Sequence, residues 1–422
     1  MNLSPSSPSL SMGYSLRTAD PGTDSTLTAF LDAAFQRPNR ESKLVAQLAA
    51  SYPTFDPGLS LVASADDRDL GYALFLPRKI RIRGCNVALA VSSPFCTLPD
   101  SRGTGVGEFL LETGLNALKD RKLRGALVLG GQEFFQAHGY CGAFNLYTCD
   151  ARRDLLPTGE TGEWSGLTAE DIPHLLELFA TNYDGVCGAE MRTNSPLDWE
   201  SNADAAYTLV RRRKGIAVAY LRFRVRDTLA VMECGAKDTE AVSSLMAFLR
   251  RLSEEHGRAT VEVHVPPPHP IFRALFRAGC MAETNNFHDE ALLRVVDWHG
   301  FLEDTAESWE RSLRLGDVSE VSLGIEGSDY TLRRLSGSSS DATQGPRLEV
   351  VKGRSSLHVT LPDDWAAPLM TGRLDWRDLQ FASQGTNSMR ELEACGHELL
   401  SVLFPKGTPM WTYSPVFEIA DE

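Results

Sequence analysis

Residues 98–107 have the sequence LPDSRGTGVG, in which three glycines at alternate positions follow an arginine. An apolar run over residues 91–98 leads into this stretch, and apolar residues at helical spacing follow it over residues 106–122. Glycine lets a backbone approach a ligand closely, and the unpaired amides that begin a helix point outward at its positive end. The stretch therefore predicts a strand, a phosphate-binding turn and a helix.

The spacing of the glycines distinguishes between kinds of phosphate-binding loop. A Walker loop has Lys and then Ser or Thr after its last glycine, whereas Glu108 follows Gly107 here. A dinucleotide-binding loop has the spacing GxGxxG, but its final position is Leu110 in this chain. The pattern that remains is Arg102, two residues, Gly105, one residue and Gly107. A plain glycine-rich turn is the alternative, because such turns are common.

The chain beyond the loop contains a second motif. A central strand of small aliphatic residues is expected at 125–129, and a short helix is expected at 133–138, ending at Gly139. Residues 134–140 have the sequence FFQAHGY. The loop and this aromatic-aromatic-x-x-x-Gly-aromatic segment together resemble the pyrophosphate loop and the following segment of the GNAT acetyltransferases. The resemblance implies a mixed central sheet flanked by helices, and CoA as the phosphate ligand.

A second, looser copy of this order of elements follows a polar segment around residues 155–164. A helix at 239–256, a strand at 259–265 and a short helix at 270–278 repeat the pattern of the first copy. The stretch that corresponds to the glycine loop, residues 234–240, keeps one glycine and contains two acidic residues. Because acidic side chains at a helix N-terminus repel a phosphate, we expect the second copy to be structural.

The predicted elements change character again after residue 303. Short alternating strands and one late amphipathic helix indicate an α+β domain without a catalytic cluster. The fold class is therefore expected to be mixed α+β, with tandem GNAT folds followed by an α+β domain. The expected divisions are a disordered tail at 1–13, a first GNAT domain at 14–155, a degenerate second one at 156–303, and a C-terminal domain at 304–422.

Length and charge narrow the classes of function. A chain of 422 residues is too long for one core, so several domains are expected. A formal net charge of −14 offers no basic excess for nucleic-acid phosphates, and nucleic acid is not an expected partner. No run has the length and apolarity of a membrane span. The Ser- and Pro-rich start, residues 1–14, has neither the basic end nor the apolar centre of a secretory signal.

The eight cysteines and nine histidines are scattered along the chain. No CxxC pair occurs, and no cluster of Cys and His has the spacing of a metal site, so no metal is expected. Most of the cysteines fall in apolar, strand-like segments, which indicates reduced thiols in a cytoplasmic protein.

The order of the domains extends the resemblance to nearly the whole chain. Two GNAT domains, the second degenerate, and a C-terminal domain similar to a sterol carrier protein form the arrangement of the Eis (enhanced intracellular survival) acetyltransferases. The resemblance implies transfer of acetyl from the co-substrate acetyl-CoA to a primary amine, such as an aminoglycoside, a polyamine or a lysine side chain. It also implies a homo-oligomer, since several members are hexamers.

The resemblance assigns roles to the residues around the loop. The strand that ends at Leu98 is expected to separate from its neighbour and to pair with the pantetheine arm. The amides of the loop and the Arg102 side chain are expected to hold the pyrophosphate, as the physics of the loop also predicts. The acceptor pocket is expected beside the first two helices, with Phe30 and Phe35 as candidate walls. The expected cofactor-binding residues are Phe95, Cys96, Thr97, Arg102, Gly103, Thr104, Gly105, Val106 and Gly107.

The expected proton donor is missing from its usual place. The family uses a tyrosine acid at the second aromatic of the segment, and that position is Phe135 here. His138 and Tyr140 are the nearby ionisable candidates, and water is the alternative because a CoA thiolate leaves readily. The family's base is the carboxylate of the chain terminus, here Glu422. Because of Phe135, a non-catalytic acyl-CoA- or lipid-binding scaffold with a GNAT fold remains the alternative function.

Overall fold

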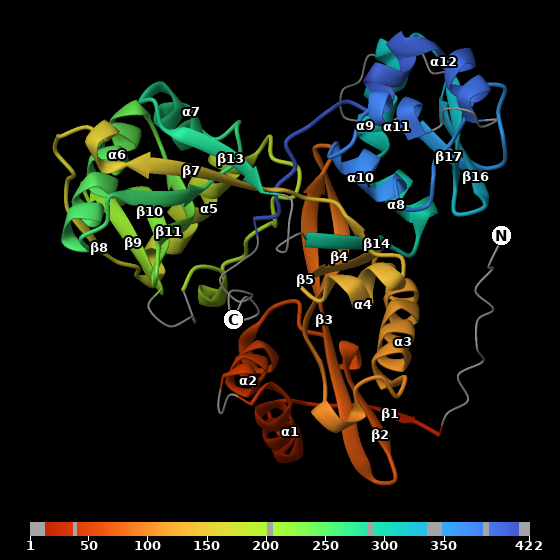
Figure 1. The fold of residues 1–422 in the computed structure, drawn as a ribbon, viewed down its shortest axis with the longest axis horizontal. Helices are drawn as coiled ribbons and strands as arrows, with labels where there is room; N and C mark the ends of the chain where they lie inside the picture. Colours follow the sequence, from red (N-terminus) through yellow and green to blue (C-terminus); the bar gives the residue numbers. More distant parts are fainter. Residues whose placement is uncertain are drawn as a thin grey trace.

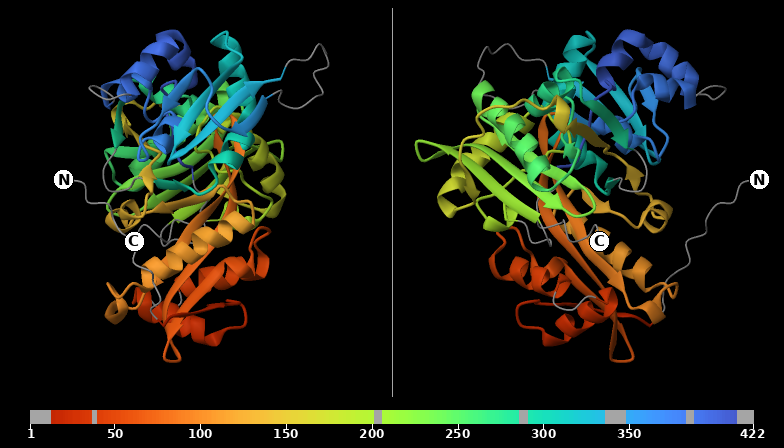
Figure 2. Two further views of the ribbon diagram at one scale, coloured as in Figure 1. Left: turned by 90° about the vertical axis from the view of Figure 1, so that its right-hand side faces the viewer. Right: turned by 60° about the vertical axis from the view of Figure 1, so that its left-hand side comes forward.

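The computed structural model of the chain describes residues 13–36, 40–200, 206–285, 291–335, 348–382 and 388–412. Within these residues, two seven-stranded sheets and one four-stranded sheet each organise a unit of the molecule (Figure 1). Helices pack on all three sheets, so the mixed α+β class expected from the sequence is confirmed. The views in Figure 2 place α1 and α2 at one end of the molecule and the C-terminal unit at the other.

The first unit has the strand order β1-β2-β3-β4-β5-β14-β6. Its strands are β1 (Ser15–Thr18), β2 (Ser60–Ala65), β3 (Arg68–Ile82), β4 (Cys85–Thr97), β5 (Gly125–Leu129), β6 (Cys141–Gly142) and β14 (Ala291–Val295). Its helices are α1 (Ser25–Phe35), α2 (Glu41–Ser51), α3 (Val106–Asp120) and α4 (Gln132–Ala137). The β4–β5 pair is parallel and α3 makes the crossover between them, as the strand, turn and helix of the sequence predict.

Alternate residues of β3 face opposite layers of this unit. Tyr72 and Leu74 belong to the cluster of buried residues that contains the apolar residues of α1 and α2. Ala73 and Phe75 belong to the cluster that contains those of α3. Successive side chains of a strand point to opposite faces, so an almost continuous apolar strand supports helices on both sides of the sheet.

Two tight turns define the β2–β3–β4 meander. Asp66 and Asp67 both have positive φ (50° and 60°), the conformation that a tight two-residue hairpin turn requires. The next turn lies at Arg83 and Gly84, again with positive φ (54° and 79°). β3 therefore runs without a break from Arg68 to Ile82. The short Arg-Gly signal is easily missed, because both flanking segments are equally strand-like.

The second unit repeats this architecture, with the order β13-β7-β12-β11-β10-β9-β8. Its strands are β7 (Leu146–Arg152), β8 (Trp164–Gly166), β9 (Ala206–Arg213), β10 (Ile216–Val225), β11 (Leu229–Ala236), β12 (Thr260–His264) and β13 (Met281–Asn285). Its helices are α5 (Ile172–Tyr183), α6 (Thr239–Glu255) and α7 (Pro270–Arg277). The parallel pair β11–β12 flanks α6 as β4–β5 flanks α3, which is the order of the expected second copy.

The two units exchange one strand each. Residues 146–152, expected in the first domain, form β7 beside β12 of the second sheet. Residues 291–295, expected in the second domain, form β14 beside β5 of the first sheet. The sheets therefore cross the divisions expected at 155 and 303. The exchange supplies an antiparallel partner to the open edge of a central strand in each sheet, and such an edge must be paired when it is buried.

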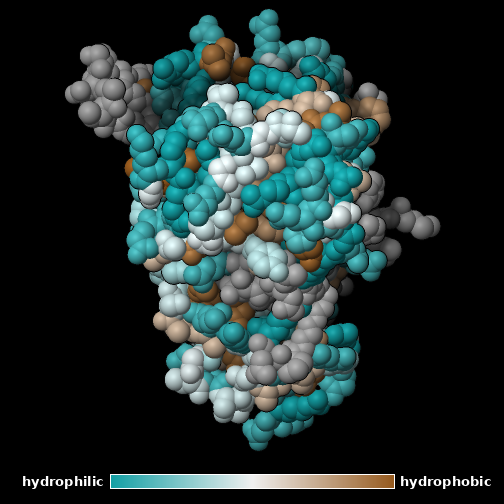
Figure 3. All heavy atoms as spheres, turned by 90° about the vertical axis from the view of Figure 1, so that its left-hand side faces the viewer, coloured by the Kyte–Doolittle hydropathy of each residue, from teal (hydrophilic) through white to brown (hydrophobic). Residues whose placement is uncertain are grey.

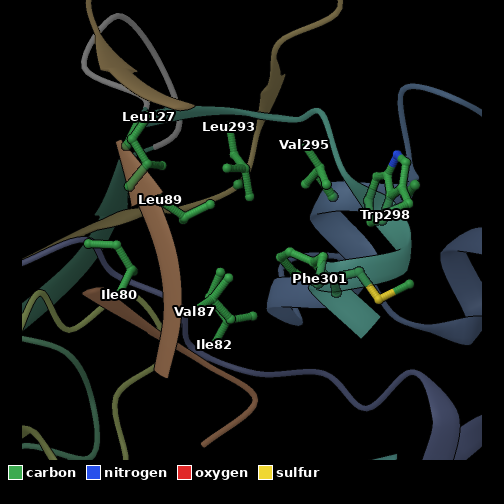
Figure 4. Packing of buried hydrophobic residues seen from close by; sticks show 14 of the residues in the cluster. Ile80, Ile82, Val87, Leu89, Leu127, Leu293, Val295, Trp298 and Phe301 are labelled. Atoms are coloured by element: carbon green, nitrogen blue, oxygen red, sulfur yellow. The ribbon is translucent and has the colours of Figure 1, made fainter. Parts of the chain in front are cut away.

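The C-terminal unit packs helices on a four-stranded sheet with the order β17-β16-β15-β18. The strands are β15 (Glu320–Ile325), β16 (Ser328–Arg334), β17 (Leu348–Lys352) and β18 (His358–Thr360). The helices are α8 (Trp298–Asp304), α9 (Ala306–Leu315), α10 (Ala366–Thr371), α11 (Trp376–Ala382) and α12 (Ser388–Leu403). Figure 4 shows apolar side chains of β3, β4 and β14 close to Trp298 and Phe301 of α8, so one core joins this unit to the first.

The turn end of the β3–β4 hairpin lies between the other two units (Figure 1). The amide of Arg81 donates to the carbonyl oxygen of Ala189 in the second unit, at 2.9 Å. The Arg83 guanidinium donates to Ser308 of α9 and lies 3.9 Å from the ring centroid of Trp309. The hairpin that forms one wall of the first unit thus also fixes the three units relative to one another.

A network of buried charges lies where this hairpin meets the second unit. Arg78 of β3 pairs with Glu190 and, at 3.0 Å, with Asp198. The last described segment joins the network, because the indole of Trp411 donates to Glu190 at 3.0 Å. The network contains three positive and three negative side chains, all buried: Arg78, Arg192, Arg222, Glu190, Asp198 and Glu233. Its balanced charge makes its burial tolerable.

The surface shown in Figure 3 is mainly hydrophilic, with small separate apolar patches. Among the described residues, no helix combines the length and apolarity needed to cross a bilayer.

Candidate active site

The parallel strands β4 and β5 separate part-way along their length. Their registered pairs are Ala90 with Ala126 and Val91 with Leu127, and the pairing stops there. Beyond this point β4 keeps its partner β3 on the other side, as far as Thr97. The edge of β4 that faces β5 is therefore open over residues 92–97, where the family resemblance implies a separated strand.

The glycine loop connects the open part of β4 to α3. Gly105 is the N-cap of α3 in a left-handed conformation (φ 96°), which favours glycine. Glycine has no side chain that could accept hydrogen bonds from the first amides of α3, so these amides have no side-chain cap. Two hydrogen bonds to neighbouring groups hold Thr104: its hydroxyl donates to Ser101 O at 2.7 Å, and its carbonyl accepts from the Tyr14 hydroxyl at 2.8 Å. The loop is thus shaped before any ligand arrives.

A cavity of about 430 Å³ lies over this loop, between α1, β4, α3 and α4. Six of the nine cofactor-binding residues expected from the sequence line it: Phe95, Cys96, Thr97, Arg102, Gly103 and Gly107. Thr104 and Gly105 lie in the loop without lining the cavity, and Val106 is buried beneath it. The structure therefore brings most of the expected residues to one site, and Arg102 is exposed at its edge.

Aromatic rings form one wall of this cavity. The ring of Phe95 lies 5.8 Å from that of Phe134 and 5.4 Å from that of Phe135, measured between centroids. Phe135 is 5% exposed and lines the cavity directly. Burial raises the pKa of the neighbouring Cys96 thiol, so this wall supplies no ready proton donor or thiolate at neutral pH.

A second cavity, of about 330 Å³, adjoins the first. The two share several lining residues, including Phe35, Phe95, Arg102 and Phe135. Of the candidate acceptor walls, Phe35 lines both cavities, whereas Phe30 is buried in the core. The second cavity extends along α2 and past the open edge of β4, which is the side expected for an acceptor.

The sequence interpretation missed two polar residues of the second cavity. Glu41, in the first turn of α2, lines it and is only 4% exposed. Ser92 of β4 lines it at the point where β4 and β5 separate. Little in the sequence marks these two residues as part of a site. A carboxylate at the start of a helix usually interacts favourably with the helix dipole, and a serine in an apolar strand is common.

The candidate acids lie apart from these cavities. The Tyr140 ring is 5.2 Å from the Phe135 ring, between centroids, but Tyr140 lines a different cavity, with Arg294. His138 is half-buried, and its Nδ1 lies 2.7 Å from the carbonyl oxygen of Phe134. Neither side chain lines the two cavities beside the loop. The candidate base, Glu422, lies outside the described residues.

Replacing Tyr140 by phenylalanine tests the assignment of this residue. Burial raises its pKa, and its hydroxyl has no hydrogen-bond partner among the described residues. An unsatisfied buried hydroxyl costs free energy, so Tyr140→Phe should leave stability unchanged or raise it by up to about 1 kcal/mol. Urea unfolding measures this effect. If the variant instead loses the acetyl transfer expected from the family resemblance, at wild-type stability, Tyr140 contributes to the chemistry.

The loop position of the second unit has a different geometry. Asp238 is the N-cap of α6 and accepts a hydrogen bond from the amide of Ala241 at 2.9 Å. Arg213 donates to both Asp238 and Glu240. A carboxylate therefore occupies the helix N-terminus where a phosphate lies in a working loop. Among the described residues, no group of three or more His, Cys, Asp or Glu side chains is arranged to hold a metal ion.

The sequence and the structure were compared with those of known proteins. No family model matches the sequence. One curated relative is the uncharacterised N-acetyltransferase YjhQ of Escherichia coli K12, at 28% identity over 102 residues. That match spans 24% of this chain and 56% of the relative, so the chain covers only about half of that protein's length.

Solved structures match over nearly the whole chain. A GCN5-related N-acetyltransferase from Anabaena variabilis superposes with a TM-score of 0.67 at 17% identity, covering 95% of this chain and 100% of that one. A GCN5-related N-acetyltransferase from Kribbella flavida superposes with a TM-score of 0.66 at 16% identity, covering 94% of this chain and 97% of that one. Eis1 from Mycobacterium abscessus superposes with a TM-score of 0.60 at 18% identity, covering 95% of this chain and 100% of that one. The separated strands, the glycine loop and these likenesses agree, and the chain has the fold of the GCN5-related N-acetyltransferases.

Proposed function

We propose that this protein transfers the acetyl group of acetyl-CoA to a primary amine, by direct attack while both substrates are bound. The observation that supports the proposal most strongly is the meeting of three features at one place: the glycine loop, the open edge of β4 and the second cavity. An acetyltransferase needs an anchor for the pyrophosphate, a track for the pantetheine arm and a chamber for the acceptor.

The residues of the first cavity fit CoA. The amides that begin α3, with Arg102 and Gly103, would hold the pyrophosphate, because they combine helix-end donors with a positive side chain. Phe95, Cys96 and Thr97 on the open edge of β4 would lie along the pantetheine arm, with their backbone groups as partners. The thioester would then lie near Phe95 and Phe135, which the two cavities share.

The chemistry is aminolysis of a thioester. The attacking amine must be neutral, the carbonyl oxygen needs donors, and the departing sulfur needs a proton. Phe135 has no proton to give, and Tyr140 and His138 lie away from the cavities. We therefore propose that the thiolate of CoA leaves without a side-chain acid and takes its proton from water. Position and orientation of the substrates would supply most of the rate enhancement.

The base is proposed to be the terminal carboxylate of Glu422. Support comes from the described residues just before the terminus. Thr412 donates its amide to the carbonyl oxygen of Gly188, and Met410 donates to Cys187. This segment is thus fixed to the second unit beside the β3–β4 hairpin.

The remaining assignments rest on the resemblance to the Eis enzymes. We propose that residues 14–155 form the working domain, with its sheet completed by β14, and that residues 156–303 form a structural one. The proposal extends to a sterol-carrier-like C-terminal domain over 304–422, a homo-oligomer and a cytoplasmic location. A non-catalytic acyl-CoA- or lipid-binding scaffold is the second candidate, and the observation that favours it is Phe135 at the acid position.

Released thiol distinguishes the two functions. The protein is incubated with acetyl-CoA and a panel of amines (an aminoglycoside, a polyamine, a blocked lysine and a simple alkylamine), and a thiol-reactive dye reports CoA. If the protein is an acetyltransferase, thiol is released only when an amine is present, and mass spectrometry detects the acetylated amine. CoA binding by calorimetry, without thiol release for any amine, would contradict the enzyme and support the scaffold.

A further inference from the structure

The second cavity has a distinct polar end. Glu41 lines it from the first turn of α2 and is 4% exposed. Neighbouring residues of the same helix, Leu44, Val45 and Leu48, are buried in the core, so the helix that holds this carboxylate is firmly packed. Glu41 is the one carboxylate among the described residues that line this cavity. A buried carboxylate facing a cavity favours a cationic ligand group.

A second polar group in the same cavity points to a ligand independently. Ser92 is 3% exposed, and its hydroxyl oxygen has no hydrogen-bond partner among the described residues. Buried hydroxyls are usually satisfied, so an unpaired one that lines a cavity indicates a partner that enters from outside. The hydroxyl can accept a hydrogen bond from an ammonium or an amine.

The other walls limit what the rest of the ligand can be. Side chains of Phe35, Leu44, Phe95 and Val128 make much of the lining apolar. The remaining charged group is Arg102, which the cavity shares with the loop. A second ammonium in this chamber would find no second carboxylate among the described lining residues, and it would lie beside mainly apolar walls, where it loses hydration, or near the like charge of Arg102. One cation and an apolar chain match the chamber, and its 330 Å³ suits a small molecule or a single side chain.

We propose that the acceptor is a small monocationic primary amine with an apolar chain, such as an alkylamine or a lysine-type side chain, and that Glu41 and Ser92 bind it as an ammonium ion. The ammonium releases one proton to the base of the proposed function before its nitrogen attacks the thioester carbon. This inference names the acceptor class of the proposed function and rests on that function for the transfer step. Glu41 acts as the specificity-determining residue, because it compensates the one charge that the acceptor brings into the chamber. Polycationic aminoglycosides and polyamines are disfavoured.

Calorimetric titration of the full-length protein with n-hexylamine, with and without saturating CoA, tests the proposal. Two ligands of the same chain length serve as controls: 1-hexanol has no positive charge, and 1,6-diaminohexane has two. We expect n-hexylamine to bind better than either. Glu41→Gln should weaken n-hexylamine about tenfold and leave 1-hexanol unchanged. Glu112→Gln, which removes an exposed carboxylate from α3 outside both cavities, should change neither.

Ser92→Ala provides a second variant should Glu41→Gln fail to fold, and it should weaken n-hexylamine several-fold. Failure of n-hexylamine to bind, wild-type affinity in the available variants, or tighter binding of the diamine would overturn the inference. The thiol assay separates this result from the proposed function. Bound amine without thiol release contradicts the transfer activity alone, whereas amine-dependent thiol release that is unaffected by Glu41→Gln contradicts the role of Glu41 alone.

Discussion

Replacing Glu190 by glutamine is expected to lower the free energy of unfolding by about 3–5 kcal/mol. Glu190 has no exposed surface and forms ion pairs with Arg78 and Arg192. Glutamine has nearly the same shape but no charge, so both guanidinium groups would keep their positive charge in the interior without this counter-charge. Removing one partner from a buried ionic cluster is costly, because the remaining charges were taken out of water at a cost that the pairing offset.

The position of Glu190 makes the effect larger than that of one ion pair. Its carboxylate also accepts a hydrogen bond from the Trp411 indole, and its residue bridges to Ile80 of β3. The substitution therefore loosens contacts between the first unit, the second unit and the C-terminal segment. We expect a lower urea midpoint by tryptophan fluorescence, which buried Trp199 and Trp411 report.

An exposed ion pair provides the control. Glu307 of α9 pairs with Arg311 one helical turn away, and both side chains are mostly exposed. Glu307→Gln removes the same charge from a solvated surface, where such pairs contribute little, so its midpoint should match that of the wild type. Equal midpoints for Glu190→Gln and the wild type would mean that the buried network is not needed for stability.

Replacing Arg102 by alanine should weaken CoA binding by roughly 1–3 kcal/mol, a change of about five- to over a hundredfold in dissociation constant. The side chain is exposed at the edge of the first cavity, directly before the loop whose helix-end amides favour anions. A guanidinium adds charge-assisted hydrogen bonds to phosphate oxygens, and alanine removes them without changing the glycine conformations. Titration calorimetry with CoA measures the difference.

A nearby arginine shows whether Arg102 acts through direct contact with CoA or only through its positive charge. Arg68 begins β3 and pairs with Asp100, two residues before Arg102, at 2.7 Å with both side chains exposed. It lines neither cavity, so Arg68→Ala should leave the CoA affinity close to that of the wild type. Rising salt should also reduce the difference between wild type and Arg102→Ala. Equal affinity of Arg102→Ala and wild type would exclude Arg102 from the site.

Local patterns predicted the features that depend on neighbouring residues. The turn at 98–105 and the helix from Val106 follow from glycine, helix spacing and the preceding apolar run, and the structure contains them. The sequence also placed acidic residues at the start of the corresponding helix in the second unit, and the structure shows that one of them, Asp238, is the N-cap of α6. These features need contacts of only a few residues along the chain, so the sequence states them directly.

Long-range pairing escaped the sequence interpretation. Alternation and apolarity show that residues 146–152 and 291–295 are strands, but they do not say which sheet each one joins. The exchange of β7 and β14 depends on which buried edges lack a partner, and that is a property of the assembled sheets. The buried charges at Arg78 and Glu190 are likewise 112 positions apart and resemble surface residues in the sequence.

The sequence by itself determined the strand, the phosphate-type turn and the helix at 91–120, since glycine geometry and helix-end dipoles are local properties of the chain. By its resemblance to the GNAT enzymes, it also led us to expect an acid at the position of Phe135. Only the tertiary structure decided what surrounds the loop. The separation of β4 from β5 opens the cleft, and the packing of α1 and α2 on the sheet brings Glu41 within the same cavity as Ser92, 51 positions away. Burial and proximity turn these ordinary residues into a candidate site, and both arise only when the helices of the first unit pack on its sheet.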